Sequence, residues 1–269
     1  MSTLEGFDWF QPEDLPVLFK ALRQVNPPAI LVGGQSLTFW VDFFELPIPR
    51  TSTPFLTQDA DILGSKLDAQ IIAKFLKNGK AKTPLADDHT PSTGMITYDA
   101  NGRKLLIDVM GTLCGLNNDE IKETAITLNI AQYGDVSILH PRLVLISRIS
   151  NLKVLQSKRD KNGITQAKLA IEMYKSFITW FRTQLISNSE YQDFLLSKAE
   201  ELKRISLSDA SVYVYQNYGI NVLDSFPIGL VENQKFLELQ WPNINKWFLE
   251  KVKLYSLKAE LQEHDGEYQ

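Results

Sequence analysis

The chain has 269 residues, of which 44% are hydrophobic and 22% charged, a composition typical of a globular protein with a substantial core. The formal net charge of -4 excludes a general attraction to nucleic acid or anionic lipid, although a local basic patch could still bind RNA. The single cysteine, Cys114, excludes an intrachain disulfide, and no apolar run approaches the roughly 20 residues of a membrane span.

The first part of the chain is predicted to form a helix, a buried strand, a glycine turn and a second helix, followed by a proline-rich loop. Apolar residues at helical spacing indicate the helices, and a short apolar run indicates the strand. Gly33 and Gly34 follow the strand directly and form a turn at which a side chain would obstruct a close approach to the backbone. The expected bounds are 12–25 for the first helix, 29–32 for the strand, 35–45 for the second helix and 46–55 for the loop.

An aspartate pair lies on the next predicted strand, 58–63. Because side chains alternate along a strand, Asp59 and Asp61 point to the same face. Two carboxylates about 4 Å apart repel by on the order of 4 kcal/mol at an effective dielectric near 20, so we expect a cation or a proton to relieve the pair. Ser65 and Asp68 then form a capping box that begins the next helix.

A third aspartate lies on a predicted hairpin. Asn101-Gly102 is a strong signal for a short turn between two strands, since both positions tolerate positive φ. Asp108 lies on the second strand of this hairpin among apolar residues, where a carboxylate requires a reason to be kept. The acidic segment 87–89 is interpreted as part of a polar loop rather than a metal cluster, because no regular element aims its side chains.

The rest of the chain is predicted to be a second hairpin over 125–139 and then mainly helical. The fold class is therefore α+β, with a mixed sheet and flanking helices over 1–139 and a helical domain over 140–269. The helices of the second domain are expected at 140–156, 165–187, 189–203, 209–218 and 242–261.

The glycine turn and the three aspartates together suit nucleotide chemistry. A glycine turn that leads into a helix presents backbone N–H groups and a positive helix end to a phosphate, and Ser36 adds a hydroxyl. Three converging carboxylates offer the hard oxygen ligands of Mg²⁺ or Mn²⁺, which also bind substrate phosphates. Two such ions can activate an attacking oxygen and stabilise a leaving pyrophosphate.

The order Gly-Gly-x-Ser, helix, Asp-x-Asp and a later Asp resembles the DNA polymerase beta nucleotidyltransferase superfamily. The likeness lies in Leu31-Val-Gly-Gly-Gln-Ser36, Thr57-Gln-Asp-Ala-Asp-Ile62 and Leu106-Ile-Asp-Val109. It implies a nucleotidyltransferase-type sheet in which the third acid lies near the attacking hydroxyl. The metal ligands that it implies are Asp59, Asp61 and Asp108, and the implied triphosphate contacts are Gly33, Gly34 and Ser36.

The likeness continues into the helix that begins at His140 and the basic turn Lys158-Arg-Asp-Lys161. These are similar to segments of bacterial stand-alone members, which include antitoxin-like, abortive-infection-toxin-like and aminoglycoside-modifying relatives. The resemblance implies that Lys153, Lys158 and Arg159 meet the triphosphate tail; an ordinary solvated helix end is the alternative. The proline-rich segment makes the spacing between the glycine turn and the aspartate pair longer than in the minimal relatives.

Two functions follow as expectations. The first is a metal-dependent nucleotidyltransferase that moves a nucleoside monophosphate from an NTP such as ATP to a hydroxyl of a small molecule, a protein or a tRNA, and releases pyrophosphate. The second is a non-catalytic, antitoxin-like interaction module on the same fold, with an RNA or protein partner in a toxin–antitoxin role. The start of the sequence has no basic stretch followed by an apolar one, so we expect a cytoplasmic protein with no membrane partner.

Overall fold

The computed structural model describes residues 6–10, 12–47, 59–85, 90–130, 134–185 and 187–266, with the backbone alone at 12 and 259–266. The acidic segment 87–89 and most of the proline-rich loop lie outside these residues. The chain divides into two compact units, 1–147 (the first unit) and 148–269 (the second unit). The division falls within helix α5 (Pro141–Val154), whereas the sequence placed it just before that helix.

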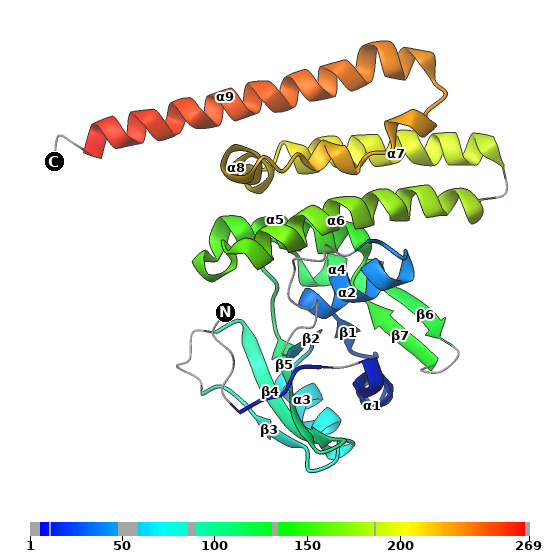
Figure 1. Cartoon of the computed structure of the whole chain (residues 1–269), viewed down its shortest axis with the longest axis vertical. Coiled ribbons are helices and arrows are strands. Elements are labelled where there is room, and N and C mark those ends of the chain that lie inside the picture. The colour runs from blue at the N-terminus through cyan, green and yellow to red at the C-terminus, as the bar shows by residue number, and fades with distance from the viewer. Residues whose placement is uncertain are drawn as a thin grey trace. The chain divides into compact units, whose positions relative to one another are not determined.

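Seven strands in the described part of the chain form one mixed sheet. Their bounds are β1 Ile30–Leu31, β2 Asp59–Leu63, β3 Lys80–Lys82, β4 Ser92–Ala100, β5 Arg103–Met110, β6 Ile126–Ile130 and β7 Gly134–Ile138. The strand order is β3-β4-β5-β2-β1-β7-β6 (Figure 1). Strand β2 pairs in parallel with β5, and β1 pairs in parallel with β7, while the other pairs are antiparallel.

Among its described residues, the first unit also contains one α-helix before β1 and three α-helices between its strands. Their bounds are α1 Leu15–Leu22, α2 Gly33–Phe43, α3 Lys66–Lys74 and α4 Asn118–Thr124. The predicted capping box begins α3: Ser65 Oγ accepts from Asp68 N–H at 3.2 Å, and Asp68 Oδ2 accepts from Ser65 N–H at 2.6 Å. Helix α2 is bound to the residue that follows β7, because Trp40 Nε1–H donates to Leu139 O at 2.8 Å.

Strands β4 and β5 form the hairpin that the Asn-Gly turn predicts. Asn101 and Gly102 have φ values of 52° and 77°, which suit a tight turn between strands of right-handed twist. The hairpin sits beside β2 in the sheet, so β2 lies between two strands from distant parts of the sequence. The α+β class, with a mixed sheet, flanking helices and a C-terminal helical region, is confirmed.

Within its described residues, the second unit contains helices and no strand. Besides the end of α5, it contains α6 Lys161–Trp180, α7 Asn188–Ser206, α8 Asp209–Tyr218 and α9 Trp241–Gly266. Helices α6 and α7 run alongside each other (Figure 1), and the buried Tyr174 of α6 donates a hydrogen bond to Glu201 of α7. Gly219, with φ of 63°, ends α8. Within the described residues, no helix is both long and apolar enough to cross a membrane.

Candidate functional site

The sheet brings the three aspartates together on one face. Strand β2 lies in register with β5 so that Asp61 is directly opposite Asp108, while Asp59 lies opposite Leu106. Partners across neighbouring strands point to the same face, and residues two apart on one strand do so as well. Asp59, Asp61 and Asp108 therefore share a face, and each of the three is half-buried.

Asp108 lies in partly desolvated surroundings. Burial raises the pKa of Asp108 above its usual value, the hydrogen bond from Ser92 acts against this, and the negative charge of Asp59 raises the pKa further. Asp59 and Asp108 thus lie within electrostatic reach of each other across the β2–β5 pair. Ser92 Oγ donates to Asp108 Oδ1 at 2.6 Å.

The glycine turn lies directly against Asp61. A Cβ built on Gly33 would come within 1.8 Å of Asp61 Oδ2, and Gly33 has φ of +62°. The preceding residue, Val32, donates its N–H to Asp61 O at 2.9 Å, which extends the β1–β2 pairing up to the turn. Only glycine satisfies both the positive φ and the close approach of the carboxylate.

Helix α2 begins at Gly33, earlier than the sequence indicates, so the glycines form its first turn. Val32 is the N-cap and has no side-chain hydrogen bond to the helix. Ser36 is fully buried and donates its hydroxyl hydrogen to Gly33 O at 2.9 Å, so it closes the first turn. Gly34 is also buried, and the N–H groups of this turn lie at the positive end of the helix dipole.

The basic residues predicted to meet a triphosphate belong to the second unit. Arg159 donates to Leu152 O at 3.0 Å and to Lys153 O at 2.6 Å, and its guanidinium lies 5.3 Å from the ring centroid of Tyr213. Arg159 therefore caps the carbonyls at the end of α5. Lys153 Nζ lies 3.6 Å from a carboxylate oxygen of Asp209, and Lys158 is exposed.

The three aspartates are oxygen donors of the kind that Mg²⁺ and Mn²⁺ prefer, and they come from neighbouring strands. They are not drawn into a ready-made cage: no three His, Cys, Asp or Glu side chains among the residues described by the structure are grouped closely enough to hold a metal ion. The donor set fits a divalent cation, and its binding requires the carboxylates to move closer together.

Sequence reasoning missed Ser92, which lies outside the three motifs. Its contact with Asp108 depends on the local geometry of β4, and a serine at the start of a strand carries no signal of such a contact. It also missed Gln35, which is 5% exposed and whose Nε2 has no hydrogen-bond partner among the described residues. A glutamine on an otherwise apolar helix face is the signal that could have identified Gln35.

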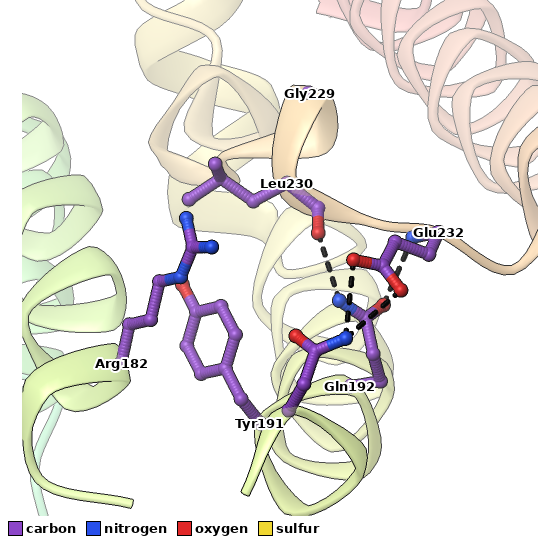
Figure 2. A pocket seen from close by; sticks show the side chains of 7 residues that line it. Arg182, Tyr191, Gln192, Gly229, Leu230 and Glu232 are labelled. Atoms are coloured by element: carbon purple, nitrogen blue, oxygen red, sulfur yellow. Dashed lines mark hydrogen bonds between the residues drawn. The ribbon is translucent and has the colours of Figure 1, made fainter.

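A cavity of about 140 Å³ lies in the second unit, between the start of α7 and the loop before α9 (Figure 2). Its polar groups largely bond to one another. Asn188 Nδ2 lies 3.0 Å and 3.2 Å from the carboxylate oxygens of Glu232, and Gln192 Nε2 donates to Leu230 O at 3.0 Å. These bonds fix the loop against α7, which accounts for Asn188, Gln192 and Glu232 without a ligand.

No protein-family model matches the chain, and no curated protein matches it. Among the solved structures that match is the crystal structure of the Megavirus polyadenylate synthase, with 10% sequence identity and a TM-score of 0.37. The match covers 62% of this chain and 36% of that chain.

Proposed function

We propose that the chain is a metal-dependent nucleotidyltransferase, which moves a nucleoside monophosphate from an NTP to a hydroxyl acceptor and releases pyrophosphate. The observation that carries the proposal is the register that sets Asp61 beside Asp108 on two parallel strands. The approach of Gly33 to the Asp61 carboxylate supports it, because this contact brings the acids next to a helix N-terminus. Carboxylates for a cation and N–H groups for a phosphate then lie side by side.

The proposed roles follow from what each group offers. Asp59, Asp61 and Asp108 would hold Mg²⁺ or Mn²⁺, which supplies Lewis-acid activation of the attacking oxygen and neutralises charge on the leaving pyrophosphate. The N–H groups of the Gly33-Gly34 turn would bind phosphate oxygens at the positive end of α2. Ser36 would hold this turn in shape through its bond to Gly33 O.

Lys153 and Lys158 stay predictions of the resemblance as triphosphate contacts, and both belong to the second unit. Arg159 is better explained as the cap of α5, because its guanidinium already binds two backbone carbonyls. The acceptor is a hydroxyl of a small molecule, a protein or a tRNA end.

A labelling experiment tests the proposal. The purified protein is incubated with each α-³²P-labelled NTP, Mg²⁺ or Mn²⁺, and in turn total RNA, a protein extract or a pool of hydroxylated small molecules. We expect a labelled product with one acceptor class, and a loss of more than about 100-fold in Asp59→Asn and Asp61→Asn, which lack a charged ligand. Asp193→Asn, an exposed acid of α7, is the matched control and keeps full activity. Undiminished labelling by both β2 variants contradicts the proposed ligands.

One observation favours the alternative, a non-catalytic antitoxin-like interaction module. Among the described residues, the acids are not grouped as a metal site. Calorimetric titration with ATP and Mg²⁺ separates the two functions: the enzyme binds ATP in a metal-dependent manner that Asp61→Asn abolishes, and the interaction module shows no binding heat.

A further inference from the structure

Strand β4 contains a β-bulge at Thr93. From Ala100 back to Gly94 the pairing of β4 with β5 is regular. Before Gly94 the register shifts by one residue, so that Ser92 lies opposite Met110. Met110 lies two residues after Asp108 on the same strand, and therefore on the same face of the sheet. Strict alternation along β4 would point Ser92 to the other face, so the extra residue in the bulge turns it to the face that carries Asp108.

The hydroxyl of Ser92 makes one contact that outweighs the others. Its Oγ lies 2.6 Å from Asp108 Oδ1, 3.2 Å from Gly94 O and 3.4 Å from Val109 O. A hydroxyl has a single hydrogen, and a nearby carboxylate is a stronger acceptor than a more distant carbonyl. The strand order β4-β5-β2 places Ser92 and Asp61 on opposite sides of Asp108. Ser92 therefore holds one oxygen of this carboxylate from the side away from β2.

The bulge is held by contacts to neighbouring elements. Thr93 Oγ1 lies 2.8 Å from Gly64 O, just past the end of β2, and 3.0 Å from Val109 O of β5. A Cβ built on Gly94 would lie 2.7 Å from the Cβ of Ala69 in α3, so the backbone here packs closely against that helix. Ser92 is thus placed by contacts to three neighbouring elements.

We propose that Ser92 is a positioning residue for Asp108: its hydroxyl anchors one carboxylate oxygen on the β4 side, so that Asp108 offers its other oxygen to a divalent cation held with Asp59 and Asp61. The inference rests on the proposed function, because it takes Asp108 as a metal ligand. Outer partners that orient a ligating carboxylate change metal affinity by about 10–100-fold when they are removed.

Mn²⁺ binding measured by electron paramagnetic resonance, with and without a non-hydrolysable ATP analogue, tests this role without requiring turnover. We expect Ser92→Ala to weaken Mn²⁺ binding about 10-fold, and Ser92→Thr, which keeps the hydroxyl, to bind as the wild type does. Ser137→Ala is the matched control, because it removes a hydroxyl of β7 whose partner is Thr127 and not a carboxylate. Thermal unfolding checks that each variant is folded.

The outcomes separate this inference from the proposed function. If Ser92→Ala fails to fold, Ser92→Thr is compared with Ser92→Val, which has the same shape and lacks the hydroxyl; weaker binding by Ser92→Val alone supports the role. Wild-type Mn²⁺ affinity in Ser92→Ala or Ser92→Val, together with weak binding in Asp108→Asn, overturns the role of Ser92 and leaves the metal site intact. Wild-type affinity in Asp108→Asn overturns both the site and the inference.

Discussion

At Gly33 the backbone comes closer to a carboxylate than any side chain would allow. Gly33→Ala adds a Cβ within 1.8 Å of Asp61 Oδ2 at a φ of +62°. We expect it to lower the free energy of unfolding by more than the roughly 1–2 kcal/mol that a left-handed conformation costs an L-residue, as measured by urea denaturation. Gly219→Ala isolates that conformational part, because Gly219 has φ of +63° with nothing within 4 Å of its built Cβ. Equal losses in the two variants would contradict the close contact.

Burial of the Asp108 carboxylate raises its pKa and makes its negative charge unfavourable in the folded state near neutral pH. Because the folded pKa lies above the unfolded one, the folded state binds the proton more tightly. The stabilisation that this proton gives is fully present at a pH below the pKa of Asp108 in the unfolded state. It is lost as the pH rises through the pKa of Asp108 in the folded state. In EDTA at neutral pH, Asp108→Asn should therefore raise the free energy of unfolding, by no more than about 1 kcal/mol because the group is partly solvated.

Thermal denaturation over a pH series checks this prediction for Asp108. The difference between Asp108→Asn and the wild type should shrink as the solution becomes acidic, since the wild-type carboxyl is then neutral as well. Asp193→Asn, at an exposed site on α7, is expected to show no comparable trend. A difference for Asp108→Asn that does not change with pH would show that burial of its charge is not the cause.

At the scale of elements, the first residues of β5, which follow the hairpin turn, bind the N-terminal residues to the sheet. The N–H of Asp8 donates to Lys104 O, and Lys104 N–H donates to Asp8 Oδ2, both at 2.8 Å. Arg103 donates to Trp9 O at 3.1 Å and forms an ion pair with Asp14 at 2.6 Å. The side chain of Asp14 is fully buried, so the guanidinium provides its counter-charge.

Removal of the Asp14 carboxylate should therefore destabilise the first unit. We expect Asp14→Ala to lower the free energy of unfolding by about 3 kcal/mol, because it leaves Arg103 without the partner of a buried pair. Asp99→Ala is the comparison: this half-buried acid accepts a 2.7 Å hydrogen bond from Asn78, and its loss should be within about 1 kcal/mol. Urea denaturation of both variants measures the difference, and similar losses would argue against a structural role for the ion pair.

Local signals predicted most elements. The Asn-Gly turn, the Ser65 capping box and the helical periodicities identified the β4–β5 hairpin, α3 and the helices of the second unit, since each depends on residues close in sequence. Strand β3 was missed because its three exposed residues, Lys80–Lys82, have no apolar alternation and pair only at the sheet edge. The sequence indicates a start at Gln35 for α2, two residues after its observed start at Gly33, because glycine is a weak helix former.

The candidate site was predictable in its chemistry and not in its register. Asp59, Asp61 and Asp108 were identified from alternation and from a charge among apolar residues. Their juxtaposition depends on the parallel pairing of β2 with β5, a contact between segments with a helix and two strands between them. Ser92 depends on a bulge of one residue, and a shift of that size reverses the face of a side chain without any mark in the local pattern.

At the scale of the molecule, the two units are each compact, so variants in one should report on that unit. Tyr174→Phe removes the hydrogen bond to Glu201 between α6 and α7, and we expect it to reduce stability by about 1 kcal/mol. Hydrogen exchange measured by mass spectrometry should then show lower protection in the second unit and unchanged protection in the first. Asp14→Ala should show the reverse, and a uniform loss across the chain in both variants would indicate a single cooperative unit.

The position of β2 in the sheet has a consequence for synthesis on the ribosome. Strand β2 leaves the ribosome after its antiparallel partner β1 but well before β5, so in the nascent chain Asp59 and Asp61 lie on an open strand edge with unpaired backbone groups. The third acid arrives only when the β4–β5 hairpin has emerged and joined that edge. A nascent protein that stalls before Asp108 thus has the glycine turn and two of the three aspartates, while the edge of β2 that β5 later covers is still open.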